Sequence, residues 1–347
     1  MGRPGRRGTE MKAIKLEKPY EIEEVEIAMP QPKAGEALIR VKSAGICGSD
    51  IGAYRGTNNL VTYPRIIGHE IAGEVLSIPE NEKGIKAGDK VIVDPYLYCG
   101  HCYPCSIGRT NCCEDLHVLG VHVDGGMSEY FCHPADMLVK VPDDMDWKYI
   151  PMAEPLTIAL HGLHRTQLKK GEHIAVIGAG TIGLMAALAA LSYGAVPILL
   201  DIVPERLELA KKLGVPYVIN SAKDPVEEMI LKYTGGRKAE VVMEASGANA
   251  AILMTLDLVS NAGRIALTGW PKNPTMFPTD LITKKEVDIR GSRTSAGEFE
   301  EAVSMIYEKK IPMDQILTKV VSVDEAAQAV RDIEKNPGNY LKVNVLF

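Results

Sequence analysis

Strand-like and helix-like segments alternate strictly after Pro151, and this alternation constrains the fold more than any other feature. Short apolar runs such as HIAVIG, PILLD and RIALTG are separated by segments of helical periodicity such as TIGLMAALAALSYG and PERLELAKKLG. Apolar strands joined by helical crossovers are typical of a parallel sheet covered by helices. We therefore expect a doubly wound, Rossmann-type parallel sheet over residues 152–292, with EVDIRGS at 286–292 as its sixth strand.

The rest of the chain predicts a second domain of another class. At 347 residues the chain exceeds the length at which one hydrophobic core usually stops growing. Residues 11–151 contain short alternating segments, such as EALIRVKSAG and DKVIVDPY, broken by Gly and Pro, which indicates a β-rich domain. Within 293–347 we expect an amphipathic helix at AGEFEEAVSMIYEKK and a last strand, LKVNVLF, that returns to the first domain. Residues 1–10 are predicted to be a flexible leader.

Charge and hydropathy exclude several classes of partner. The formal net charge is −6 with both signs interspersed, which argues against nucleic acid or an anionic membrane as the main partner. There is no run of about 18 apolar residues and no signal-peptide pattern. We expect a cytoplasmic protein that acts on small molecules and keeps its thiols reduced.

Five of the seven cysteines lie within the fifteen residues CGHCYPCSIGRTNCC. Cys99, Cys102, Cys105 and Cys113 fit the spacing C-x2-C-x2-C-x7-C, which in a reducing compartment favours a metal site over disulfides. Four thiolates predict a closed, structural Zn²⁺ site without a position for substrate. Successive side chains of an extended backbone point in opposite directions, so only one of Cys112 and Cys113 is expected to reach the metal.

The first strand of the alternating region leads into GAGTIG, a dinucleotide-binding pattern in its required strand–turn–helix context. Gly178 allows the tight turn, Gly180 lets a pyrophosphate approach the backbone, and Gly183 permits close packing of the helix on the strand. Thr181 and Ile182 lie in the same turn, where free N–H groups at the helix N-terminus would bind phosphate.

Asp201 ends the next strand, eighteen residues after Gly183. A carboxylate there accepts hydrogen bonds from the adenine ribose and repels a 2′-phosphate, so we predict NAD over NADP. Arg206 leaves an alternative open, because it could bind a phosphate, stack on adenine or be solvated.

Three short segments contain side chains of the types that form an open zinc site. GICGSD supplies Cys47 and Ser49, GHE supplies His69 and Glu70, and MAEPL supplies Glu154 at the domain junction. One thiolate, one imidazole and one or two carboxylates can hold Zn²⁺ with a vacant position.

GHE, GICGSD, the cysteine lobe, AEPL and GAGTIG, in this order and at these intervals, resemble the zinc-dependent medium-chain dehydrogenases over residues 11–347. The polyol branch, which includes sorbitol and threonine dehydrogenases, is most similar, and CGHCYPCSIGRTNCCEDLHVLGVHVDGGMSEY and GSRTS resemble the L-gulonate and L-galactonate 5-dehydrogenases. The resemblance implies a GroES-like first domain, two zinc ions per subunit, and oxidation of an alcohol with hydride transfer to NAD. L-Threonine, sorbitol or galactitol are alternative substrates, and a catalytically silent dinucleotide-binding protein of the same fold is an alternative of another class.

The same resemblance assigns roles to the residues of the open site. Cys47 and His69 match zinc ligands, and Glu70 and Glu154 match the two acidic positions, of which either one binds the metal directly. Ser49 matches the hydroxyl that handles the alcohol proton. Many relatives have a His three residues later, where this chain has Gly52.

A sugar acid requires a cation in the site, and Arg293 in GSRTS is our candidate because its planar fork suits a carboxylate. Binding of a cofactor phosphate, or a surface ion pair, is the alternative role for this arginine. His122 in GVHVDGG is a second candidate for substrate contact, as is Asp124. The resemblance also implies a homodimer or homotetramer that associates through EVDIRGS.

Overall fold

The computed structural model describes residues 10–347, which divide into two units. The first unit contains the described residues up to Glu154 together with Met313–Phe347, and the second contains Pro155–Pro312. Of the predicted leader, residues 1–9 lie outside the described part, and Glu10 already begins a strand. No helix in the described range is long and apolar enough to cross a membrane.

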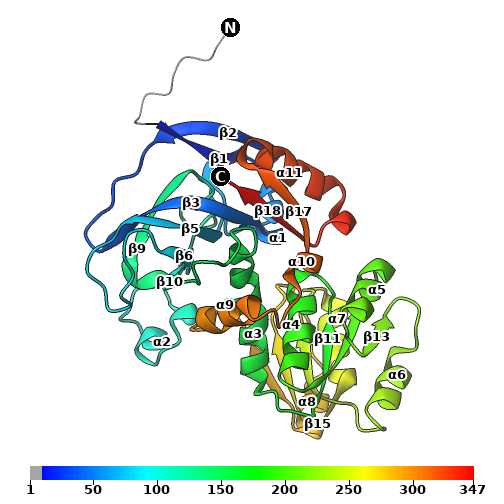
Figure 1. Ribbon diagram of the computed structural model, residues 1–347. Coiled ribbons are helices and arrows are strands. Elements are labelled where there is room, and N and C mark those ends of the chain that lie inside the picture. Colours follow the sequence, from blue (N-terminus) through cyan, green and yellow to red (C-terminus); the bar gives the residue numbers. More distant parts are fainter. Residues whose placement is uncertain (1–9) are drawn as a thin grey trace. The chain divides into compact units, whose positions relative to one another are not determined.

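The second unit is built on the predicted parallel sheet (Figure 1). Its six strands have the order β13-β12-β11-β14-β15-β16. Every neighbouring pair in this sheet is parallel, and helices alternate with the strands along the chain. Its elements are α3 (Ala153–Thr166), β11 (His173–Ile177), α4 (Thr181–Ser192), β12 (Val196–Asp201), α5 (Pro204–Lys212), β13 (Tyr217–Asn220), α6 (Val226–Tyr233), β14 (Ala239–Glu244), α7 (Asn249–Leu258), β15 (Val259–Leu267), α8 (Thr279–Lys285), β16 (Asp288–Gly291) and α9 (Phe299–Tyr307). The first two residues of α3, Ala153 and Glu154, belong to the first unit.

Strand β11 occupies the centre of this sheet because its side chains are apolar on both faces. Ile174, Ala175 and Val176 have no exposed surface, as expected for a strand that is covered on both sides. The carboxyl ends of the central strands are therefore held in a rigid frame, and the turn that follows β11 starts from it.

The first unit is mainly antiparallel and contains the short strands predicted from its sequence. A seven-stranded sheet runs β10-β6-β5-β3-β18-β17 with β9 also paired to β3, and smaller sheets join β2-β1-β4 and β7-β8 (Figure 1). Its elements are β1 (Glu10–Lys18), β2 (Glu21–Ala28), β3 (Glu36–Ile46), α1 (Gly48–Tyr54), β4 (Arg65–Ile66), β5 (Glu70–Ser77), β6 (Lys90–Val93), β7 (Tyr96–Leu97), α2 (Tyr103–Ser106), β8 (His117–Val118), β9 (Tyr130–Pro134), β10 (Leu138–Lys140), α10 (Met313–Ile316), β17 (Leu317–Ser322), α11 (Val323–Lys335) and β18 (Lys342–Leu346).

The C-terminal strand returns to the first unit, as its sequence predicts. β18 pairs antiparallel with β3, so that Asn344 lies opposite Gly45, and Gly45 lies opposite Glu70 on β5. The last segment of the chain thereby reaches the strands that carry the GICGSD and GHE motifs.

The position of the return differs from the expected one. We expected it to start at residue 293, but residues 293–312, including α9, belong to the second unit. The physical reason is a cluster of one buried carboxylate and two histidines in that unit. Glu298 precedes α9 and accepts hydrogen bonds from His161 and His164 on α3, at 2.8 and 3.3 Å.

Candidate metal and cofactor sites

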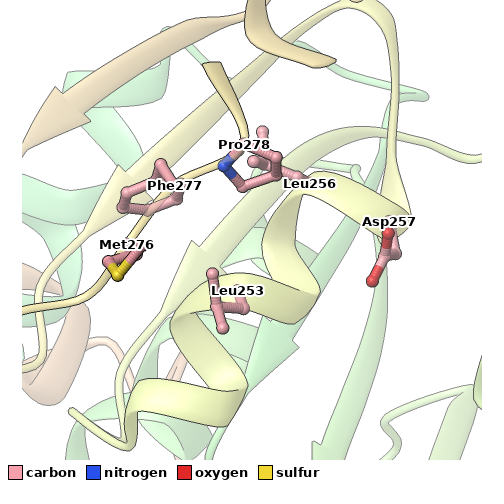
Figure 2. Close-up of a pocket in the computed structure, with 6 residues that line it drawn as sticks. All are labelled: Leu253, Leu256, Asp257, Met276, Phe277 and Pro278. Atoms are coloured by element: carbon pink, nitrogen blue, oxygen red, sulfur yellow. The ribbon is translucent and has the colours of Figure 1, made fainter. Parts of the chain in front are cut away.

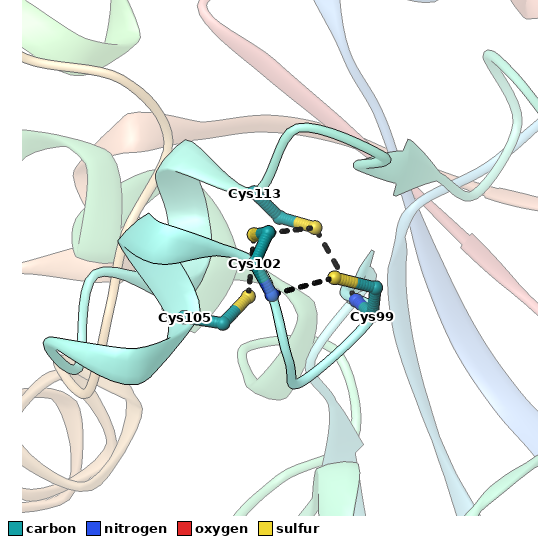
Figure 3. A group of neighbouring side chains, drawn as sticks. All are labelled: Cys99, Cys102, Cys105 and Cys113. Carbon is teal, nitrogen blue, oxygen red and sulfur yellow. Dashed lines mark hydrogen bonds between the residues drawn. The ribbon is translucent and has the colours of Figure 1, made fainter.

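The four predicted lobe cysteines converge, and their sulfur atoms lie within 4.8 Å of one another (Figure 3). The Sγ atom of Cys102 is 3.4 Å from that of Cys105 and 3.9 Å from that of Cys113. Four sulfurs around a tetrahedral Zn²⁺, each at about 2.3 Å, would be separated by about 3.8 Å. The arrangement fits zinc, and all seven cysteines are free thiols.

Backbone N–H groups donate to Cys102 and favour its thiolate, whereas burial raises the pKa of Cys105 to about 12. Hydrogen bonds from the N–H groups of Glu114 and Cys105 lower the pKa of Cys102 to about 7. Cys113 is the buried member of the neighbouring pair and joins the group, whereas Cys112 lies 3.5 Å from the guanidinium of Arg109. Of the two neighbouring cysteines, only Cys113 belongs to the group of four.

The second group lies where β3 ends and β5 begins. Cys47 caps the N-terminus of α1, and its N–H donates to Asp50 Oδ2 at 2.9 Å, which fixes the strand-to-helix turn. His69 directly precedes β5 and follows Gly68, whose φ of +99° and close approach to Met127 suit only glycine. The ligand atoms of Cys47, His69 and Glu70 come within 4.8 Å of one another.

The electrostatics of this group call for a cation. Burial opposes protonation of His69, but the charges of Cys47, Asp50 and Glu154 outweigh it and raise the pKa of the imidazole well above its usual value. His69 Nδ1 and Glu70 Oε1 are buried without a hydrogen-bond partner. Because metal ligands must be deprotonated and paired with positive charge, a thiolate, an imidazole and a carboxylate in this state fit Zn²⁺.

Glu70 has a cationic partner that the sequence did not reveal. Lys342 on β18 forms an ion pair with Glu70, and both side chains are buried. The ammonium also donates to the carbonyl of Ile46 at 3.2 Å. A Cβ atom at Gly45 would lie 1.7 Å from Glu70 Oε2, so this position requires glycine to leave room for the carboxylate.

Glu154, the second predicted acid, lies in the first turn of α3 and is 3% exposed. It falls outside the compact group of three but is close enough to act on the charge of His69. Its Oε1 accepts a hydrogen bond from the phenol of Tyr96. Burial raises the pKa of this carboxyl to about 7, against the opposing effect of His69. Tyr96 is the other residue that sequence reasoning missed.

Ser49 lies in α1, two residues after Cys47, and its Oγ is buried without a hydrogen-bond partner. The hydroxyl is thereby available to a ligand. Gly52 lies one turn further along the same helix, and a Cβ atom there would make only ordinary contacts with Thr57 and Asn58.

The glycine-rich turn has the geometry that each predicted role requires. Gly178 has a φ of +105°, and a Cβ atom at Gly183 would lie 1.8 Å from the carbonyl oxygen of Gly178. A Cβ atom at Gly180 would have nothing within 4 Å, and this glycine caps the helix that begins with Thr181 and Ile182. An open glycine beneath a helix N-terminus fits a dinucleotide pyrophosphate.

Asp201 ends β12 and closes the same turn. Its Oδ2 accepts from the N–H of Ala179 at 2.6 Å and its Oδ1 from the N–H of Val203 at 2.8 Å. Arg206 Nη1 lies 3.9 Å from Asp201 Oδ2, so the arginine predicted as a cofactor contact faces the carboxylate. This contact between Arg206 and Asp201 does not distinguish between phosphate binding and stacking on adenine as the role of Arg206.

The residues predicted to contact substrate lie in different units. His122 belongs to the first unit, where its Nδ1 accepts the N–H of Val118 at 3.1 Å. Asp124 binds the side chain of Arg65 and the N–H of Ile66 and so has a structural role. Arg293 belongs to the second unit, two residues after β16.

A surface pocket in the second unit contains none of the predicted site residues (Figure 2). It lies between α7 and the segment before α8, and Asp257 supplies its one charged lining side chain. Its lining residues are Leu253, Leu256, Asp257, Met276, Phe277 and Pro278. This composition offers neither a metal site nor a phosphate site.

Comparison with known proteins identifies the family. Residues 33–143 match the alcohol dehydrogenase GroES-like domain, and residues 181–308 match the zinc-binding dehydrogenase domain. The chain belongs to the zinc-dependent medium-chain dehydrogenases, in the branch that includes sorbitol, threonine and galactonate dehydrogenases. It is accordingly an oxidoreductase of the alcohol and polyol class.

Individual relatives cover nearly the whole chain. An uncharacterized zinc-type alcohol dehydrogenase-like protein of Haemophilus influenzae is 58% identical over 97% of this chain and 99% of its own length. An L-galactonate-5-dehydrogenase of Escherichia coli is 37% identical over 89% of this chain and 91% of its own length. A crystal structure described as a short chain alcohol dehydrogenase from Escherichia coli, complexed with NADH, superposes with a TM-score of 0.92 at 36% identity, covering 98% of this chain and 100% of that one.

Proposed function

We propose that the protein oxidises a secondary hydroxyl of a sugar acid, most specifically L-gulonate or L-galactonate at C5, with NAD as hydride acceptor. The observation that carries the reaction class is the group formed by the half-buried Cys47 and the buried His69 and Glu70, whose thiol, imidazole and carboxylate lie within 4.8 Å of one another. The similarity to an L-galactonate-5-dehydrogenase supports the substrate class.

The residues of the first unit would hold the metal and move the proton. Cys47 and His69 would bind Zn²⁺ together with Glu70 or Glu154. When bound, zinc would act as a Lewis acid on the substrate oxygen, and NAD would accept the hydride. Ser49 Oγ, buried and without a hydrogen-bond partner, would accept the alcohol proton while its own hydroxyl proton passes on to the next acceptor. With Gly52 in place of the histidine of many relatives, that proton must leave through water or the cofactor ribose.

The residues of the second unit would bind the cofactor. Gly178, Gly180 and the N-terminal turn of α4 would hold the pyrophosphate, and Asp201 would select the ribose diol of NAD. Arg293 would bind the substrate carboxylate through a bidentate pair. The cysteine lobe would hold the second, structural zinc.

A substrate panel tests this assignment directly. L-Gulonate, L-galactonate, xylitol, sorbitol, galactitol and L-threonine are each offered with NAD and with NADP while reduction of the cofactor is followed. We expect turnover of a hexonate with NAD. Preference for L-threonine or for a neutral hexitol would instead establish one of the alternative dehydrogenase activities. Absence of turnover together with a single bound zinc would indicate a catalytically silent protein.

Arg293→Met separates the sugar-acid assignment from a general loss of activity. The variant should raise KM for hexonates far more than for neutral polyols, because only the acids present a carboxylate. Arg237→Met, at an arginine of the same unit whose side chain is 67% exposed, is the matched control and should change neither. Equal effects of Arg293→Met on acids and polyols would refute the carboxylate role.

A further inference from the structure

Tyr96 is held in a defined place at the base of the cysteine lobe. It begins the two-residue strand β7, pairs with Val118 on β8, and is 4% exposed. Its backbone N–H donates to Asp94 Oδ1 at 3.1 Å. Cys99 follows three residues later in the chain, and β8 begins soon after Cys113, so the cysteine lobe connects the two strands.

The phenol of Tyr96 reaches a residue 58 positions away in the sequence. Its hydroxyl donates to Glu154 Oε1, and the bond is buried from solvent. A buried hydrogen bond to one carboxylate oxygen restricts rotation of the carboxyl group and so defines how its other oxygen is presented.

The two acids at the proposed zinc site have partners of different charge. Glu70 forms a direct ion pair with Lys342, whereas the side-chain hydrogen bond to Glu154 Oε1 comes from the neutral phenol of Tyr96. The charges of His69 and Lys342 also act on Glu154. An ammonium competes with a metal for a carboxylate, whereas a neutral donor orients the carboxylate without adding a competing positive charge. The two acids thus differ in their direct partners, an ammonium for Glu70 and a phenol for Glu154.

From this geometry we infer that Tyr96 is a positioning residue that orients the Glu154 carboxylate toward the catalytic zinc. The inference rests on the proposed function, because it requires a metal at Cys47 and His69. Tyr96 acts through Glu154 and would touch neither the substrate nor the cofactor.

The test measures zinc affinity in the full-length protein. Zinc is removed from the catalytic site with a competing chelator, while zinc at the cysteine lobe is followed separately through a Cys47→Ser reference protein. Tyr96→Phe should weaken zinc binding at the catalytic site by about 10- to 100-fold, the usual effect of losing a hydrogen bond to a metal ligand. Tyr98→Phe, two residues away on a tyrosine that is 40% exposed, is the matched control and should leave affinity unchanged.

A double-mutant cycle separates positioning from a structural effect. In a Glu154→Ala background, Tyr96→Phe should cause no further loss, because its target is absent. Affinity of the lobe for zinc should also be unchanged, although Tyr96 lies at its base. Thermal melts of the metal-free Tyr96→Phe and Tyr98→Phe proteins verify that both variants fold.

Two kinds of result would overturn the inference, and they are distinguishable. The positioning role is wrong if wild-type protein binds two zinc ions and Tyr96→Phe binds the catalytic zinc as tightly as wild type does. It is also wrong if Tyr96→Phe lowers zinc affinity by the same factor in the Glu154→Ala background as in wild type. If wild-type protein binds zinc at the cysteine lobe alone, as the Cys47→Ser protein does, the proposed catalytic site is wrong and the inference falls with it.

Discussion

Replacing Lys342 by Met should destabilise the metal-free protein much more than the zinc-loaded protein. Lys342 is 3% exposed, and its ammonium is the cationic partner of Glu70, whose side chain has no exposed surface. Methionine preserves most of the volume and removes the charge. The Glu70 carboxylate would then be left buried without its cationic partner.

Removing one partner of a buried ion pair costs about 3–5 kcal/mol, because the remaining charge is uncompensated. We expect a loss of this size in the free energy of unfolding when no zinc is bound. A divalent cation at Cys47, His69 and Glu70 would compensate the carboxylate itself, so the loss should shrink in the zinc-loaded protein. Linkage then requires Lys342→Met to bind zinc more tightly, by about tenfold for each 1.4 kcal/mol between the two losses.

Guanidinium titration followed by tryptophan fluorescence measures these losses. The chain has two tryptophans, and Trp270 is 68% exposed, so the half-buried Trp147 of the first unit should supply most of the signal. Titrations are run with excess zinc and with chelator. Zinc bound at the cysteine lobe also adds stability, but by the same amount in variant and wild type, so it cancels in the difference between the two proteins. Lys18→Met, at an exposed ion pair with Glu21, should have no measurable effect. Equal destabilisation with and without zinc, or weaker zinc binding by Lys342→Met, would refute the reasoning.

Three further predictions concern the cysteine lobe, the cofactor turn and the pH-sensitive group of Glu298 and its two histidines. Cys113→Ser should lower the zinc content by one ion per chain in metal analysis, and Cys112→Ser should not; equal losses would show that the wrong cysteine was assigned. Asp201→Asn should weaken NAD binding and reduce the affinity for NAD relative to NADP in calorimetric titrations, because the ribose loses its carboxylate acceptor. An unchanged ratio of the two affinities would contradict the role of Asp201 in selecting NAD. Burial of Glu298 raises the pKa of its carboxyl, but hydrogen bonds from His161 and His164 outweigh this effect and lower the pKa to about 2. The ionised carboxylate therefore contributes fully to stability above about pH 4.5, and this contribution is lost as the pH falls toward 2. The Glu298→Gln variant should therefore have a lower melting temperature than wild type at pH 6, and the two melting temperatures should converge near pH 2. A difference in melting temperature that stays constant between pH 6 and pH 2 would show that ionisation of Glu298 is not its cause.

The parts of the fold that could be predicted from sequence are those determined by residues close together in the chain. The parallel strands around β11 are buried on both faces and read as continuous apolar runs, and the glycine turn is fixed by contacts among residues 178–183. The lobe cysteines lie within one loop, so their spacing alone predicted their convergence.

Long-range partners could not be predicted in this way. Lys342 is a single lysine in the strand LKVNVLF, where it is indistinguishable from a lysine on an exposed edge until β18 is paired with β3. Tyr96 and Glu154 are separated by 58 residues, and neither pattern points to the other. The amphipathic pattern of α9 predicts a helix with a buried face but does not tell which unit covers it; Glu298 and its two histidines decide that.

The most direct test of the account is a zinc anomalous difference map from crystals grown with zinc and NAD. We predict two peaks per chain, one among the four lobe cysteines and one bonded to Cys47 Sγ at about 2.3 Å and to a His69 ring nitrogen at about 2.0–2.1 Å. A map with NAD bound and zinc at the lobe alone would contradict the central claim that Cys47 and His69 hold the metal on which the reaction depends.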